Sequence, residues 1–225
     1  MSPTTSTAQL RRVSLAVVVS LAVVGAAWWW LRTGEEDQQT RVDVSTAATA
    51  DCDPVNREPT KGAGAHVDDA TYDAAPPSFG DHADRWEVRA ESFYDVEDRP
   101  EVPTLVHNLE HGYNILWYDQ TVVDDEEALS RVQEIADRYA TLDRSPDPAT
   151  AFIAVPWTTA DGATFPDDRH YALTHWYADP TDRTRSRSDE AGLTRYCSTI
   201  SAEIVEDWMT AHPLREAPEG YPDLM

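Results

Sequence analysis

The longest apolar stretch of the chain runs from Val13 to Leu31, near the N-terminus. It carries no charged residue, and a helix of this length spans about 28 Å, close to the hydrocarbon thickness of a bilayer. Three tryptophans, Trp28 to Trp30, lie at its far end, where indole rings favour the headgroup layer. Arg11 and Arg12 precede it, and positive charges favour the cytoplasmic side. The pattern predicts a single-pass transmembrane helix over residues 13–31 of the cytoplasmic (plasma) membrane, with residues 1–12 in the cytoplasm and the C-terminal domain outside.

A cleaved signal peptide is the alternative interpretation of the same stretch. Gly25, Ala26 and Ala27 offer the small residues of a cleavage site, but the apolar run is long for a signal peptide. The sequence therefore favours an uncleaved anchor through which the protein contacts the membrane. Residues 32–50 are polar, small and aperiodic, which predicts a flexible linker. Residues 51–220 are then expected to form one extracytoplasmic domain.

Short apolar runs and amphipathic stretches follow one another in the second half of the chain. Three apolar runs predict strands, and two stretches with apolar residues at helical spacing predict helices. The strands are expected at 113–118, 151–157 and 170–178, and the helices at 125–141 and 193–212. This order predicts an α+β domain in which a small mixed sheet is covered by two main helices on one face.

Residues 53–103 show no sustained period and hold many of the prolines. Their composition predicts irregular chain, with a short element near Trp86–Tyr94. The segment nevertheless carries two of the seven histidines, His66 and His82. Because such loops more often surround a binding site than form the core, we expect this half of the domain to wrap around a site.

The densest group of chemically active side chains lies between residues 104 and 118. His107 and His111 are four residues apart, Glu110 lies between them, and Gly112 follows at once. The threonine that opens the stretch is typical of a helix N-cap, and the glycine is typical of a helix end. In a helix of about two turns, both imidazoles share one face and can reach one ion.

The run from His107 to Gly112, His-Asn-Leu-Glu-His-Gly, resembles the signature of a bacterial envelope family known as domain of unknown function 3105. The resemblance extends to His66 and to the run Pro76–His82, and it covers most of the chain outside the anchor. The family's usual run is Pro-Pro-Thr-Ser-Gly-Pro-His, and three positions differ here, at Ser78, Phe79 and Asp81. The resemblance implies a membrane-anchored extracytoplasmic domain, and it supplies no reaction.

The histidines of the motif and of the resemblance together favour a metal site. Neutral imidazole is a good ligand for zinc and copper, and three or four histidines suit either ion. On this interpretation His107 and His111 are the paired ligands, His82 closes the site and His66 adds a fourth ligand. A small polar ligand is the other candidate for the same group.

A structural role is an alternative that needs no ligand. His107 and His111 would then form a buried hydrogen-bond network with Asn108 and Glu110 that holds loops together. The domain would be a structural or interaction module of the cell envelope, with an envelope protein as its partner.

The motif also fits the His-x-x-Glu-His pattern of inverted zinc peptidases, in which the glutamate activates a zinc-bound water. Glu110 would then be the general base, His107 and His111 the ligands, and Glu203 or Glu206 a third ligand. The short helix and the strand expected directly after it fit that class poorly. The sequence therefore favours a binding protein over a metal-dependent hydrolase.

Cys52 and Cys197 are the only two cysteines, and both lie on the predicted outer side. Two lone cysteines in an oxidising compartment usually pair. We expect a structural disulfide that ties the start of the domain to its last helix. Two free thiols, or one cysteine as a soft metal ligand, are the alternatives.

The chain is strongly acidic, with 18 basic and 41 acidic residues and a formal charge of −23. Such a surface repels phosphate backbones, so nucleic acid is not an expected partner. It attracts cations or the basic patches of other proteins, and it is also typical of adaptation to salt. The sequence thus predicts a membrane-anchored extracytoplasmic protein of uncharacterised role.

Overall fold

The computed structural model describes residues 51–88, 90–140, 151–182 and 188–220. The predicted membrane helix at 13–31 and the predicted linker at 32–50 lie outside the described residues. Within the described part of the chain, none of the helices is long and apolar enough to cross a bilayer. The described residues all belong to one compact unit, Ala48–Met225.

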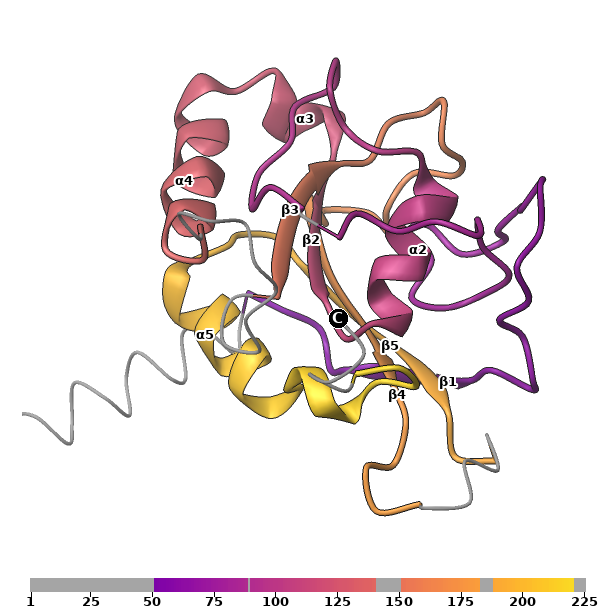
Figure 1. Ribbon diagram of the computed structural model, residues 1–225. Coiled ribbons are helices and arrows are strands. Elements are labelled where there is room, and N and C mark those ends of the chain that lie inside the picture. The colour runs from indigo at the N-terminus through magenta and orange to yellow at the C-terminus, as the bar shows by residue number, and fades with distance from the viewer. Residues whose placement is uncertain (1–50, 89, 141–150, 183–187, 221–225) are drawn as a thin grey trace, which may run out of the picture. The chain divides into compact units, whose positions relative to one another are not determined.

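A five-stranded mixed sheet forms the centre of this unit (Figure 1). Its strands lie in the order β1-β5-β4-β2-β3, with β2 and β3 parallel and the other neighbours antiparallel. Their bounds are β1 Asn56–Pro59, β2 Asn114–Tyr118, β3 Phe152–Pro156, β4 Tyr171–Tyr177 and β5 Ala191–Cys197. The predicted α+β class with a small mixed sheet is confirmed.

Helices cover both faces of the sheet. They are α2 Val102–Glu110, α3 Gln120–Val123, α4 Glu126–Asp137, α5 Ala202–Ala211 and the 3-10 helix η1 Leu214–Glu216. Figure 1 shows α4 and α5 on one side of the strands and α2 on the other. The parallel pair β2 and β3 is connected through α3 and α4.

Strand β2 illustrates why cover is needed on both faces. Leu116 packs in the core beneath α4 and α5, whereas Ile115 and Trp117 pack in the core beneath α2. Every residue of β2 and of β3 is buried. Side chains alternate across a strand, so a strand that is apolar throughout has to be covered twice. The two predicted main helices, α4 and α5, do lie on one face, but the prediction that helices cover a single face is incomplete, because α2 covers the other.

The predicted helix over 193–212 is wrong in its first part. Residues Ala191–Cys197 form β5, and α5 begins only after Ser201, whose hydroxyl accepts an amide hydrogen bond from the first turn. Leu193 packs in one core and Tyr196 against the other, which is the period of a strand. In so short a stretch the same apolar residues fit both the spacing of a helix and the alternation of a strand. Pairing with β4 is what makes this stretch a strand.

A disulfide joins Cys52 to Cys197 across 145 residues of sequence. This is the expected pair, but Cys197 ends β5 and does not lie in the last helix. The bridge therefore ties the start of the domain to the sheet.

Helix α2 begins earlier than the sequence suggests. Its N-cap is Glu101, a proline occupies the first turn, and the expected cap Thr104 is buried inside the helix. Its predicted end is close to the observed one, because Gly112 follows with φ +90. A Cβ at this position would lie 2.5 Å from the carbonyl oxygen of Leu214, so the C-terminal segment passes directly over the end of α2.

Candidate metal centre

Helix α2 supplies two of the four side chains that meet at the candidate site. His107 and Glu110 are three residues apart and therefore lie on the same face of the helix. Most of α2 is buried, and both side chains are buried with it. The helix thus holds one imidazole and one carboxylate in fixed positions within the fold.

Two loop segments bring His66 and His82 to the same place. A short parallel bridge joins them: the amide of Val67 donates to the carbonyl of His82 at 2.8 Å. The amide of His82 donates in turn to the carbonyl of Ala65 at 2.9 Å. This bridge sets the two imidazole rings 5.0 Å apart, centroid to centroid.

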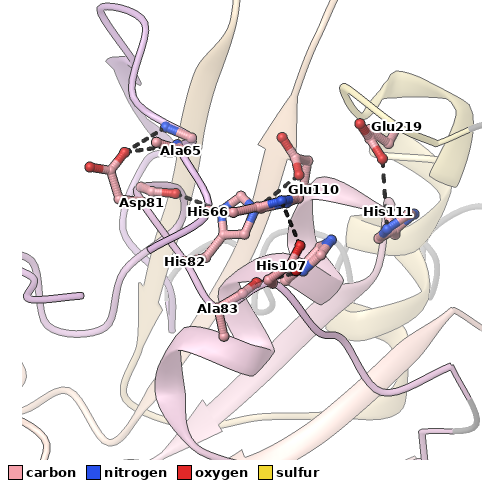
Figure 2. Close-up of polar contacts among 12 residues, drawn as sticks. Ala65, His66, Asp81, His82, Ala83, His107, Glu110, His111 and Glu219 are labelled. Atoms are coloured by element: carbon pink, nitrogen blue, oxygen red, sulfur yellow. Dashed lines mark hydrogen bonds and ion pairs between the residues drawn. The ribbon is translucent and has the colours of Figure 1, made fainter. Parts of the chain in front are cut away.

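Figure 2 shows His66, His82, His107 and Glu110 converging on one point, and we call this set the His/Glu cluster. One potential ligand atom from each residue lies within 4.8 Å of all the others. The side chains of His82 and Glu110 are almost fully buried, whereas that of His66 is 47% exposed. Four nitrogen and oxygen donors at one partly open point form an arrangement that suits a transition-metal ion.

Each histidine of the cluster uses Nδ1 for a contact with an oxygen outside the cluster. Nδ1 of His82 lies 2.8 Å from the carbonyl oxygen of Gly80, and Nδ1 of His107 lies 2.8 Å from that of Ala83. Nδ1 of His66 lies 2.9 Å from a carboxylate oxygen of Asp84. A carbonyl oxygen can only accept, so Nδ1 carries a proton in His82 and His107, and in the neutral form of each ring Nε2 is left with a lone pair.

The contact between His82 and Glu110 is electrostatically unusual. Nε2 of His82 lies 3.0 Å from Oε2 of Glu110, yet this buried nitrogen has no well-aligned hydrogen bond. Burial lowers the pKa of His82, but Glu110 and the bond to Gly80 outweigh burial and raise the pKa above its ordinary value. A neutral ring protonated at Nδ1 would turn a lone pair toward the carboxylate. A proton or a metal cation between the two groups removes this repulsion.

The pKa of His107 shifts in the opposite direction to that of His82. Burial lowers the pKa of His107, and the bond to Ala83 only partly offsets this effect. The ring is therefore neutral near pH 7, which is the form that binds a metal ion.

His111 lies outside the His/Glu cluster, although it is a predicted ligand. Its ring stacks on Trp86, with centroids 4.1 Å apart, and on His107 at 5.0 Å. Its Nε2 lies 3.7 Å from Oε2 of Glu219, away from the convergence point in Figure 2. Burial and the neighbouring His107 lower the pKa of His111 to about 4. The structure thus pairs His107 with Glu110, and His111 as a ligand stays a prediction.

Asn108 fastens a loop to α2 between these residues. Its side-chain oxygen accepts from the amide of Glu87 at 3.1 Å, and its amide group donates to the carbonyl of Glu87 at 3.1 Å. The residue is fully buried. Part of the network expected for a structural role is therefore present next to the cluster.

The remaining candidates lie elsewhere. Glu203 and Glu206 are on α5, which packs on the opposite face of the sheet from α2, and neither belongs to the cluster. His170 contacts Asp119 at 3.0 Å in a separate cavity of about 270 Å³. The third ligand that an inverted zinc peptidase needs is thus not supplied by α5.

Sequence reasoning did not identify the residues that hold the cluster in place. Oδ1 of Asp81 accepts the amides of Gly64 and Ala65 at 3.0 and 2.9 Å, and these bonds lower the pKa of Asp81. Asp84 contacts His66. The one signal in the sequence was that Asp81 replaces a proline in the run that resembles the family.

The fold and the cluster define an α+β protein whose histidines and glutamate could hold a metal ion. A model of the family described as "Protein of unknown function (DUF3105)" matches residues 66–223, and the chain belongs to this family. The match begins at His66 and includes all four residues of the cluster. Comparison with curated proteins gave no match, and comparison with solved structures gave none either.

Proposed function

We propose that this protein binds one transition-metal ion, zinc or copper, through His66, His82, His107 and Glu110. The observation that carries the proposal is the use of Nδ1 in all three histidines. Metal-binding histidines usually donate the second ring N–H to a carbonyl or carboxylate, which fixes the ring and directs the free nitrogen to the ion. Here the partners are two backbone carbonyls and one aspartate.

The composition of the cluster also supports this choice of ion. Three imidazoles and one carboxylate are typical zinc ligands, and the same imidazoles suit copper. The ligands of a tetrahedral zinc ion lie about 3.3 Å apart, and the donors of the metal-free cluster lie within 4.8 Å. We expect the side chains to close by small rotations when the ion binds. His66, on a loop, has the most freedom to move.

Elemental analysis tests the proposal directly. The full-length chain would be purified in detergent without chelators and without a histidine tag, then measured alongside His82→Gln and His107→Gln. The parent is expected to hold about one ion per chain, as a four-ligand site does, and both variants are expected to lose it. His170→Gln is the matched control, because that histidine lies outside the cluster. A parent that stays metal-free after dialysis against zinc or copper would refute the proposal.

Glu110→Gln separates the binding protein from the hydrolase. If Glu110 is a ligand, the amide weakens metal binding in the variant. If Glu110 is a general base, the variant keeps its metal and loses turnover. The 3.0 Å contact with the ring of His82 favours the ligand role.

We also propose that the domain faces outward from the cytoplasmic membrane on the anchor at residues 13–31. The disulfide between Cys52 and Cys197 supports an oxidising compartment, since such bonds are rare in the cytosol. Protease added to intact cells should remove the domain, while the same protease should leave a cytoplasmic marker intact. Protection of the domain until the cells are lysed would contradict this orientation.

A further inference from the structure

The four ligands of the proposed site differ in how firmly the fold holds them. His107 and Glu110 are on a buried helix, and His82 is fully buried. His66 lies on a loop and exposes 47% of its side chain, and its partner Asp84 exposes 88%. A structural zinc site is normally closed on all sides. This site has three enclosed ligands and one that solvent reaches.

Besides the backbone bridge to His82, the side chain of Asp81 fastens the loop that carries His66. Its Oδ1 receives the amides of Gly64 and Ala65, the two residues directly before His66. Its carbonyl oxygen receives the hydroxyl of Tyr72 at 2.7 Å. Asp81 also directly precedes the buried ligand His82. The side chain of Asp81 therefore ties the segment of the exposed ligand His66 to the segment of the buried ligand His82, and it is not itself one of the proposed ligands.

The segment that carries the exposed ligand is acidic, which favours the approach of a cation. Residues 66–84 contain five aspartates and no lysine or arginine. Asp68, Asp69, Asp73 and Asp84 are all exposed. A concentration of one sign of charge next to an opening raises the local concentration of the opposite ion.

We infer that the ion enters and leaves the site on the side of His66, and that Asp81 is a positioning residue that controls how long the ion stays. This inference rests on the proposed function. Release begins when His66 leaves the ion, and the two amide bonds to Asp81 hold the His66 segment against that movement. The domain thereby acts as an exchangeable metal site that can take up an ion and pass it on, and not as a permanently closed structural site.

Cobalt(II) is the probe for the test, because its visible spectrum reports the number and type of its ligands. The full-length parent and its variants would be loaded with cobalt, and release to EDTA would be followed by stopped-flow absorbance. Asp81→Ala is expected to keep the bound spectrum of the parent and to release the ion about tenfold faster, as loss of an outer partner of a metal site commonly does. His66→Ala is expected to change the spectrum as well as the rate.

Two further variants show whether the hydrogen bonds matter rather than the charge. Asp81→Asn keeps an oxygen that accepts both amides, so it should restore most of the parent's slow release. Asp73→Asn removes the same charge from the same loop and should release cobalt as the parent does. Circular dichroism of the metal-free variants checks that each one is folded.

The outcomes separate the inference from the function on which it rests. A parent that binds neither cobalt nor zinc overturns both. A parent that binds cobalt, with Asp81→Ala releasing it at the parent's rate, overturns the inference and leaves the metal site standing. Equal acceleration in Asp73→Asn and Asp81→Ala also overturns it, because charge alone would then explain the effect.

Discussion

Each histidine of the His/Glu cluster places Nδ1 against an oxygen, and this atom decides what the second nitrogen can do. Spacing in the sequence indicates that His107 and His111 share a helix face, but it cannot indicate which way each ring turns. The oxygen partners of the rings decide this, and two of them are the backbone carbonyls of Gly80 and Ala83. Every residue has a backbone carbonyl, so the pattern of residue types does not show which carbonyl will face a given ring. The histidines could therefore be predicted as a group, but the choice of Glu110 over His111 could not.

Asn108→Ala should reduce stability without removing a ligand. The residue is fully buried and makes two hydrogen bonds to the backbone of Glu87. The alanine variant loses both hydrogen bonds and leaves the backbone amide and carbonyl of Glu87 without these partners. This should lower the free energy of unfolding by about 2 kcal/mol. Denaturant unfolding of the metal-free protein measures this loss.

Metal content is the second readout for that variant. Asn108→Ala should still bind about one ion per chain, because it lies outside the proposed ligand set. Loss of the metal to the same degree as in His82→Gln would show that the loop held by Asn108 is part of the site. Unchanged stability would contradict the role assigned to the two bonds.

At the scale of the elements, regular periodicity was enough to find β2, β3, β4 and α4 close to their observed bounds. It failed where two periods overlap, at β5 and α5, and where the element is short and exposed, at β1. All four residues of β1 are exposed, so no apolar pattern marks them, and the strand exists because it pairs with β5. Long-range pairing of this kind cannot be read from a local window.

The end of α2 provides a test of close packing between elements. Gly112→Ala would force a side chain into a backbone with φ +90 and place a Cβ 2.5 Å from the carbonyl oxygen of Leu214. We expect a loss of about 2–3 kcal/mol in the free energy of unfolding, measured by denaturant titration. Gly62→Ala is the matched control, since φ there is +85 and no atom lies within 4 Å of the new Cβ. An equal loss in both variants would mean that backbone strain alone, and not the contact with Leu214, limits position 112.

For the whole molecule, the disulfide is the longest covalent constraint. Closing a loop of 145 residues should stabilise the fold by about 5 kcal/mol through the entropy of the unfolded chain. The double variant Cys52→Ser and Cys197→Ser should lose this amount in denaturant unfolding. The parent measured with a reductant should match the double variant, and the double variant should not respond to the reductant. A parent that is equally stable oxidised and reduced would contradict the prediction.

The stability of the whole domain should also depend on pH through a second group of histidines, His175 and His212. His175 and His212 stack with centroids 5.7 Å apart, and Trp208 packs on His212 at 4.3 Å. Burial, and then the neighbouring His212, lowers the pKa of His175 to about 3. Burial, and then the charge of Arg57, lowers the pKa of His212 to about 4.

Both rings therefore stay neutral in the folded protein until the pH falls to about 4. In the unfolded chain the same histidines have an ordinary pKa of about 6.5, so they bind protons at a higher pH. Stability rises with pH wherever the unfolded state binds more protons, so it should be complete above about pH 6.5 and fall as the pH drops toward 4. Each histidine contributes a slope of up to about 1.4 kcal/mol per pH unit.

Denaturant unfolding of the metal-free protein between pH 6.5 and 5 measures this slope while most carboxylates stay ionised. His212→Gln should reduce the slope by the share of one histidine, and an unchanged slope would show that His212 titrates alike in the folded and unfolded states.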